Sequence, residues 1–185
     1  MTKLKKILCI ICLAASFLLL AACGDSVSSL LPAKTVKFQA GAVEIEGTTD
    51  LTITLESGET ALLDQLPELQ KADFSGSSCV DEIYQWAQAH PDVKVKYTVT
   101  LPDGQVLSNS EQNLDLSALT DSAVDGTVQA LAYLPKVSSI QLGSERSDLG
   151  WDSVRAIMDA CPNASVSYAF WLYGKEFSTV DTTIN

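Results

Sequence analysis

The side chains of this 185-residue chain that could do chemistry include a single histidine, His90, and five cysteines. Histidine nitrogens and cysteine sulfurs hold metals such as Zn²⁺ through bonds of about 2 Å. His90 precedes Pro91, and Cys161 precedes Pro162 at the matching position of an internal repeat. Matching positions in successive repeats lie a whole repeat apart, so these side chains are too distant to share a metal. We expect no metal site and expect His90 to pack at a helix end.

No pattern in the sequence indicates catalysis. Serine is frequent, but there is no Gly-x-Ser-x-Gly elbow, and His90 has no local partner that would make it a nucleophile's base. The run Ser75-Gly76-Ser77-Ser78 lacks the lysine and glycine spacing of a phosphate-binding loop. The neighbours Asp81 and Glu82 point to different faces and suit a helix N-terminus better than a glycosidase acid–base pair. We therefore predict a protein that is not an enzyme and binds no cofactor.

Thiol chemistry is expected at Cys23, because the segment before it has the order of an export signal. Three lysines open the chain, an apolar run covers residues 7–20, and small residues follow. The run is shorter than the roughly 20 residues of a comfortable membrane-spanning helix. We therefore predict a cleaved signal peptide over residues 1–22, with an uncleaved anchor helix as the alternative.

The residues Leu20-Ala21-Ala22-Cys23-Gly24 resemble the lipobox of bacterial lipoproteins. The resemblance implies recognition of Leu20, Ala21, Ala22 and Cys23 by a signal peptidase and cleavage before Cys23. It also implies a covalent diacylglycerol lipid on the Cys23 sulfur. The expected location is the extracytoplasmic face of a cell membrane, to which the protein is anchored by this lipid.

The mature chain is strongly acidic. Loss of the three lysines of the signal leaves 9 basic residues against 23 acidic ones, a formal charge of −14. Such a charge repels polyanions, so we expect no nucleic-acid partner. Only Cys79 and Cys161 remain available for pairing, and the repeat places them at opposite ends of equivalent helices. We do not expect a disulfide between them.

An internal repeat organises the chain from about residue 50 onward. Ala89, Pro91, Val95, Tyr97 and Leu101 recur 71 residues later as Ala160, Pro162, Val166, Tyr168 and Leu172. Leu66-Pro67-Glu68-Leu69 likewise matches Leu134-Pro135-Lys136-Val137. Apolar spacing predicts equivalent helices over 80–89 and 152–160, each stopped by proline. Strands with hairpin-like returns are expected over 93–101 and 164–172.

This alternation of short strands and helices resembles the long-period leucine-rich-repeat-like proteins found on the surface of Firmicutes. The residues that carry the resemblance lie at 114–117, 134–142 and 168–178. It implies a curved parallel sheet and a role in contact, with no catalytic residue. The pattern departs from common leucine-rich repeats in its doubled period and its lack of an asparagine ladder.

The predicted fold is therefore α/β: a short solenoid of strand-helix units with a mostly parallel sheet and a β-rich N-terminal cap, after a cleaved lipoprotein signal peptide. Residues 181–185 match 111–115, so a third repeat begins there and the sequence reads as a fragment, or else its final strand forms a minimal edge. The expected parts are a signal peptide (1–22), lipid anchor and tether (23–33), cap (34–60), repeat 1 (61–108), repeat 2 (109–178) and the start of a truncated third repeat (179–185).

Several aromatic residues lie in the strand expected over 164–172 and in the turn after it. Among them, Trp171 and Tyr173 are the candidate binding residues. The alternative is that this strand is buried on both faces, as in most parallel sheets. Tyr97 and Tyr168, which the repeat retains, are expected in the core. We predict a non-catalytic module that binds a protein or an envelope component. A ligand-binding lipoprotein of a transporter or sensor and an envelope-acting hydrolase are the alternatives.

Overall fold

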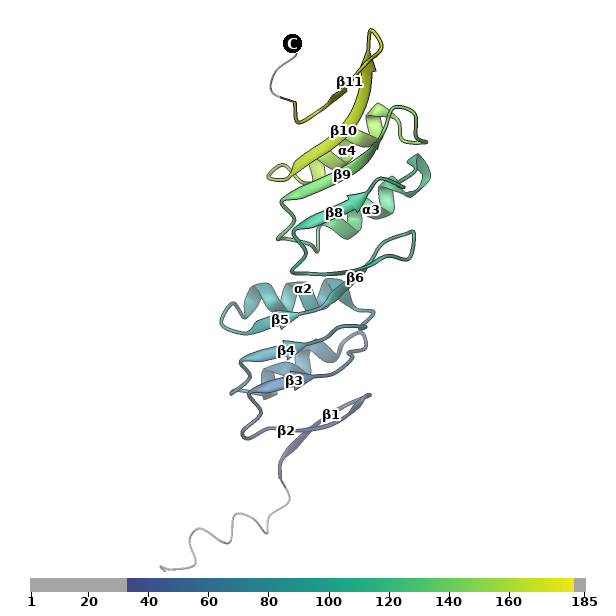
Figure 1. Ribbon diagram of the computed structural model, residues 1–185. Coiled ribbons are helices and arrows are strands. Elements are labelled where there is room, and N and C mark those ends of the chain that lie inside the picture. The colour runs from purple at the N-terminus through teal and green to yellow at the C-terminus, as the bar shows by residue number, and fades with distance from the viewer. Residues whose placement is uncertain (1–32, 182–185) are drawn as a thin grey trace, which may run out of the picture.

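The computed structural model describes residues 33–181 and has a mixed α/β fold with four β-sheets in that range. The predicted signal peptide, Cys23 and residues 182–185 lie outside the described residues. Between residues 33 and 181, none of the helices has the length and apolar character needed to cross a membrane. The elements are stacked along one long axis, and the two ends of the described chain lie at its opposite ends (Figure 1).

A β-hairpin closes the N-terminal end of the stack. Strand β1 (Thr35–Phe38) pairs antiparallel with β2 (Gly41–Glu44). Val36 and Phe38 of β1 alternate with exposed residues and are buried in the core. The hairpin is a sheet of its own, so it acts as a cap over the elements that follow.

The first parallel sheet contains β3 (Asp50–Thr52), β4 (Lys71–Asp73) and β5 (Lys94–Lys96), in that order. A 3-10 helix, η2 (Glu59–Gln65), connects β3 to β4, and helix α2 (Val80–Ala89) connects β4 to β5. The boundary that the sequence suggests at residue 60 therefore falls within the connection between two paired strands, β3 and β4.

The second sheet has the order β11-β10-β9-β8 and is parallel except at β11. Its strands are β8 (Asn113–Leu116), β9 (Ser139–Ser144), β10 (Ser165–Leu172) and β11 (Lys175–Ser178). The connections contain the short 3-10 helix η3 (Asp121–Ala123), α3 (Val124–Leu131) and α4 (Trp151–Ala160). The predicted strand-helix-strand unit and both helices followed by proline are present.

Both predicted hairpin-like returns are present. β6 (Thr98–Thr100) pairs antiparallel with β7 (Val106–Ser108), as β10 pairs with β11. In the first half of the molecule, however, the predicted strand over 93–101 is divided into β5 and β6 at Tyr97.

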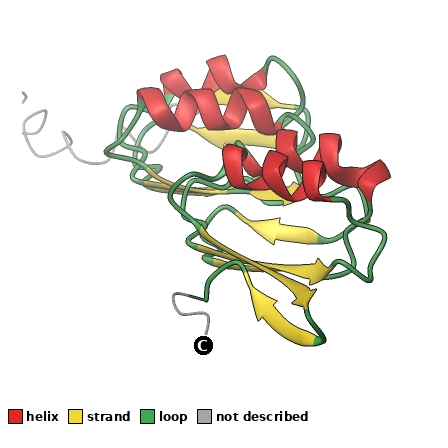
Figure 2. Ribbon diagram, turned by 90° about the horizontal axis from the view of Figure 1, so that it is seen from above, coloured by secondary structure: helices red, strands yellow, loops and turns green. Residues whose placement is uncertain are grey.

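The helices cover one face of the sheets, and the opposite face is open (Figure 2). Inward residues such as Leu114, Ile140 and Val166 are buried against the helices. Burial of β10 on both faces, one alternative from the sequence, is therefore wrong. Apolar residues alternate with polar ones along these strands because only one face is covered.

Two segments of the chain share an order of strands and several equivalent backbone bonds. We call Asp50–Glu111 copy 1 and Asn113–Asp181 copy 2. The backbone N–H of Lys94 donates to the Gln70 oxygen at 2.8 Å, and Ser165 N–H donates to Ser138 at the same distance. The registers agree as well, because Val99 pairs with Leu107 where Phe170 pairs with Phe177. Equivalent residues can therefore be compared one by one.

Candidate binding surface

The tip of the β10–β11 hairpin carries the most exposed aromatic side chain of the described chain. Tyr173 and Gly174 form a two-residue loop with φ angles of 52° and 81°. Positive φ at both positions is the geometry of a type I′ turn, which normally selects Asn or Gly rather than tyrosine. The Tyr173 side chain has a relative exposure of 105%. Its ring contributes no burial to offset the unfavourable backbone conformation, which makes it a candidate contact residue.

Trp171 lies two residues before Tyr173 and is partly buried. The guanidinium carbon of Arg146 is 4.0 Å from the centre of the Trp171 ring, a cation–π contact. The loop that holds Arg146 is fixed to the strand, because the N–H of Glu145 donates to the Ala169 oxygen at 2.9 Å. Arg146 was not predicted from the sequence, since nothing in the local pattern links it to a residue 25 positions later.

The helix-facing side of the same hairpin exposes an apolar cluster that we call the end patch, made of Trp151, Met158, Phe170 and Phe177. The rings of Phe170 and Phe177 stack with their centres 6.0 Å apart. All four residues line an open hollow of about 370 Å³, together with polar residues at 178–181. Trp151 is 51% exposed. This cluster was not predicted from the sequence, because an aromatic surface was expected on the strand alone. Trp151 and Met158 lie on helix α4.

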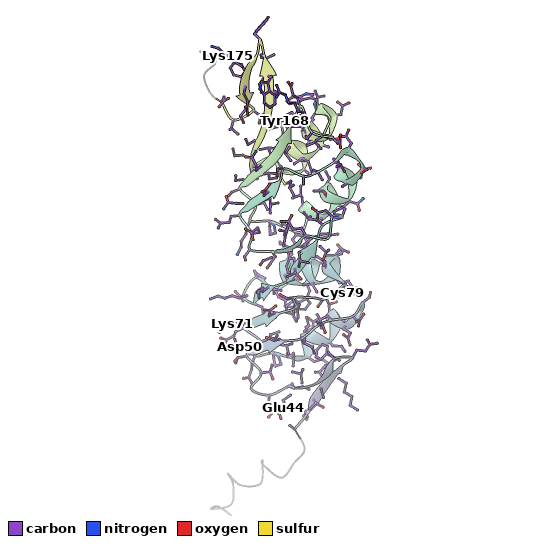
Figure 3. The ribbon with its side chains drawn as sticks, turned by 45° about the vertical axis from the view of Figure 1, so that its right-hand side comes forward. Glu44, Asp50, Lys71, Cys79, Tyr168 and Lys175 are labelled. Carbon is purple, nitrogen blue, oxygen red and sulfur yellow. The ribbon has the colours of Figure 1, made fainter. Side chains whose placement is uncertain are left out.

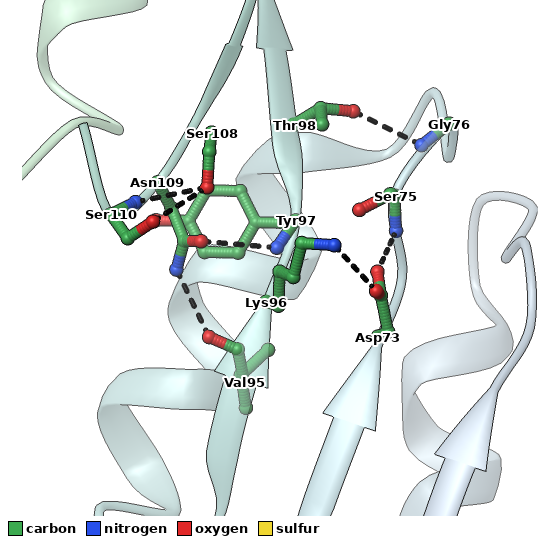
Figure 4. A network of polar contacts seen from close by, with 10 residues as sticks. All are labelled: Asp73, Ser75, Gly76, Val95, Lys96, Tyr97, Thr98, Ser108, Asn109 and Ser110. Carbon is green, nitrogen blue, oxygen red and sulfur yellow. Dashed lines mark hydrogen bonds and ion pairs between the residues drawn. The ribbon is translucent and has the colours of Figure 1, made fainter.

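The open face of the sheets is polar, and its charge differs between the copies. In copy 1, Lys71 pairs with Asp50 at 2.9 Å and Lys96 with Asp73 at 2.8 Å (Figures 3 and 4). Hydrogen bonds from Lys96 and Ser75 lower the pKa of Asp73 to about 2. The equivalents of these four residues in copy 2 are uncharged: Ser139, Asn113, Ser167 and Gln141.

The side chain of Asn109, just after β7, pairs with backbone groups of Val95 and Tyr97 in copy 1. The side chain of Asn109 accepts from the Tyr97 N–H at 3.2 Å and donates to the Val95 oxygen at 3.0 Å (Figure 4). Thr179 makes the same two contacts in copy 2, to the Tyr168 N–H and the Val166 oxygen. Asparagine and threonine thus fill equivalent positions in the two copies.

The residues considered for metal binding have structural roles. His90 Nδ1 lies 2.9 Å from the Trp86 carbonyl oxygen, and the His90 ring stacks on that of Trp86. The predicted packing of His90 at a helix end is therefore confirmed. Cys79 is the N-cap of α2 and Cys161 the C-cap of α4, and burial raises the pKa of both thiols. Within residues 33–181, no cluster of three histidine, cysteine or acidic side chains could hold a metal ion.

The carboxylates considered for acid–base chemistry also hold the structure together. Glu82 accepts hydrogen bonds from the Ser57 hydroxyl and, at 2.7 Å, from the Gly58 N–H, and these bonds lower its pKa. Its neighbour Asp81 points elsewhere, accepting from Gln85 at 3.1 Å. In the serine-rich run, the Ser77 hydroxyl accepts from the Leu55 N–H at 2.8 Å. These groups fix the loops around α2.

Comparisons with known proteins leave this surface to be interpreted from its own geometry. No model of a protein family matches the chain, and no curated protein or solved structure matches it significantly. The two predicted residues, Trp171 and Tyr173, lie on one hairpin. Together with Arg146 they form what we call the hairpin surface, which could make aromatic, cation–π and hydrogen-bonding contacts with a partner.

Proposed function

We propose that this protein is a lipid-anchored, non-catalytic interaction module that binds a protein or an envelope component through its hairpin surface. The observation that carries the proposal is Tyr173, a fully exposed aromatic ring held in a positive-φ turn. Tyrosine and tryptophan are enriched at the energetic centres of protein interfaces. Beside it, Trp171 stacks with Arg146, and arginine is also enriched at these centres.

The scaffold of this module is a short solenoid of strand-helix units with a mostly parallel sheet. Three features support this interpretation: the equivalent hydrogen bonds of copies 1 and 2, the stacking of all elements along one axis, and the cap at one end. A solenoid presents repeated positions in a row, which suits extended contact with a partner. This architecture also matches the leucine-rich-repeat-like resemblance of the sequence.

Anchoring is proposed at Cys23, outside the described residues, and rests on the lipobox resemblance and the signal-like segment before it. The test is metabolic labelling of the full chain with a traceable fatty acid. The native chain should become labelled and enter the membrane fraction. Cys23→Ser should abolish both labelling and membrane retention, and labelling of that variant would contradict the assignment.

Binding is tested with the chain from Gly24 onward, immobilised and exposed to envelope extracts. Tyr173→Gly removes the ring and keeps the turn, because glycine adopts positive φ without strain. Trp171→Ala removes the second aromatic side chain. Each should lower the capture of a saturable partner by at least about tenfold, the size of a hot-spot loss of 1.4 kcal/mol or more. The matched control is Val106→Ser, which alters an exposed residue on the equivalent β6–β7 hairpin of copy 1.

Three outcomes would contradict the proposal. Unchanged capture by both aromatic variants would show that the hairpin surface is not the binding site. Equal loss for Val106→Ser would indicate a general effect on the fold. Capture of a small molecule in place of a protein or wall component would favour the ligand-binding alternative.

A further inference from the structure

The end patch has an exact counterpart in copy 1, and the two differ in burial. Val99 and Leu107, at 3% and 6% exposure, occupy the positions of Phe170 and Phe177, which are partly exposed. Leu101 is 3% exposed, whereas its equivalent Leu172 is 45% exposed. The same backbone thus carries an apolar face that is covered in copy 1 and open in copy 2.

The unit that covers the face of copy 1 is the first strand-helix unit of copy 2, Asn113–Leu134. Its helix α3 approaches with small residues: a Cβ added to Gly126 would lie 2.7 Å from the Pro102 ring. Ala130, near the end of that helix, is 8% exposed. At this junction α3 and the β6 strand share the walls of one hollow, which includes Val80, Val99 and Ala130. Small helix residues therefore allow the close approach.

Tyrosines complete the junction between the copies. The Tyr97 hydroxyl donates to the Tyr133 carbonyl oxygen at 2.8 Å, just after α3. The Tyr133 ring meets Tyr84 edge-on with ring centres 5.6 Å apart, and its hydroxyl lies 3.3 Å from Asp81. Tyr168, the equivalent of Tyr97, instead donates to Leu149 within its own copy at 3.0 Å. Tyr97 therefore bonds to the next unit of the stack, whereas Tyr168 bonds within its own copy.

The two ends of the stack also differ in whether they are covered. The β1–β2 hairpin covers the N-terminal end, and its Val36 and Phe38 are buried there. At the other end, Trp151 takes the place of Val80 and Arg155 that of Tyr84. These side chains lie on the side of α4 that corresponds to the covered side of α2, and Trp151 is much larger than Val80.

We propose that the end patch is a docking surface for one further strand-helix unit of the type formed by Asn113–Leu134. The incoming helix lies over Phe170 and Phe177 much as α3 lies beside Val99 in copy 1. Phenylalanine side chains are larger than the valine and leucine at the equivalent positions of copy 1. The incoming helix must therefore have glycine or alanine at the positions equivalent to Gly126 and Ala130. The proposal concerns a face of the hairpin opposite Trp171, so it stands independently of the hairpin surface.

A second copy of this chain fits the patch less well. Its own Asn113–Leu134 unit is already packed between copies 1 and 2, and its N-terminal end is covered by the cap. Two chains of formal charge −14 also repel each other. We therefore assign the occupant as a further strand-helix unit of this type rather than a second copy of the described residues.

The test appends the chain's own unit in the register of the repeat. Asn185 corresponds to Asp115, so residues 116–138 are added directly after Asn185. The three tryptophans are replaced by fluorotryptophan and resolved by fluorine NMR, with Trp86→Phe and Trp171→Phe to assign the Trp151 signal. In the extended chain the Trp151 signal should shift and lose its sensitivity to exchange of H₂O for D₂O, and the melting temperature should rise.

Matched controls separate docking from mere attachment. A shuffled sequence of the same 23 residues should leave the Trp151 signal exposed. In the extended chain, Phe170→Ser with Phe177→Ser should restore that exposure. Circular dichroism of the unextended double variant checks that the scaffold still folds, and Leu172→Ser alone offers a milder change if it does not.

The proposal is overturned by a solvent-exposed Trp151 in an extended chain whose added segment is present and intact. It is also overturned if the unextended chain protects Trp151 in a concentration-dependent manner, measured with sedimentation, because the occupant is then a second copy. Protection by a small molecule from an envelope extract would assign the hollow to a ligand instead.

Discussion

Copies 1 and 2 share the order of their strands and main strand pairings, although η2 stands in copy 1 where η3 and α3 stand in copy 2, and their surfaces differ. Inward positions are apolar in both, for example Ala72 and Ile140, and the helices α2 and α4 both end before a proline. Outward positions differ, because the two Lys–Asp pairs of copy 1 have neutral residues at their equivalent positions in copy 2. The apolar face toward the C-terminal end of each copy carries aliphatic side chains and is covered in copy 1. In copy 2 the same face carries aromatic side chains and is open. The fold thus depends on a few retained positions, while the remaining positions are free to define separate binding surfaces.

The largest contrast is expected between Leu107→Ala and Phe177→Ala, which alter equivalent positions. Leu107 is 6% exposed, so its truncation should lower the free energy of unfolding by about 2–5 kcal/mol. Phe177 stacks on Phe170 at an open face, and its truncation should cost only about 1 kcal/mol. Urea unfolding measures both. A larger loss for Phe177→Ala would show that the two faces are not equivalent.

A smaller effect is expected for Asn109→Ala, which removes both bonds of its side chain to the backbone of Val95 and Tyr97. Leaving these groups unpaired should cost about 1–3 kcal/mol. Thr179→Val removes the corresponding bonds of copy 2. It should cost less, because water reaches the open end and replaces them. Hydrogen exchange of the Tyr97 and Tyr168 amides checks this order, and a greater effect at Tyr168 would reverse it.

The junction between the copies is tested by Gly126→Ala. Overpacking against the Pro102 ring should cost about 1–3 kcal/mol, and the helix preference for alanine offsets about 1 kcal/mol of it. A net loss of about 1 kcal/mol is expected in thermal or urea unfolding. Adding Pro102→Ala should remove the loss. Failure of the double variant to recover would place the conflict elsewhere in α3.

The smallest expected effect concerns the charged pairs of copy 1. The pKa of Asp73 is lowered in the folded state from 3.8 to about 2, so ionised Asp73 stabilises the fold above pH 3.8. That contribution is lost as the pH falls from about 4 to about 2. Asp73→Asn should therefore flatten the acid dependence of the urea midpoint and reduce its dependence on salt. Gln141→Ala, the neutral control in copy 2, should leave both dependences unchanged.

Much of the scaffold could be predicted from the sequence because it depends on local signals. The spacing of Ile83 and Trp86, followed by Pro91, defines α2 to the residue. Division of the following strand at Tyr97 could not be predicted, since the matching segment with the equivalent Tyr168 forms one continuous strand, β10. Coverage of one sheet face or of both was left open by the sequence, because the short strands are apolar enough to suit either arrangement.

The binding surface was predicted in part. Trp171 and Tyr173 were selected by their residue types, and the structure exposes Tyr173 fully. The partner of Trp171, Arg146, and the partners of Phe170 on α4 come from other parts of the chain. Contacts between elements depend on how loops and helices pack in three dimensions, which one sequence without an alignment does not reveal.

The unequal ends of the stack give the molecule a direction. The chain enters at the capped end, where β1 begins, and leaves at the open end beyond β11 (Figure 1). On the proposed lipid anchor at Cys23, which precedes β1 in the sequence, the capped end would lie nearer the bilayer and the open end farther from it. Each unit inserted between the two ends would lengthen the reach of the aromatic tip without altering either terminus.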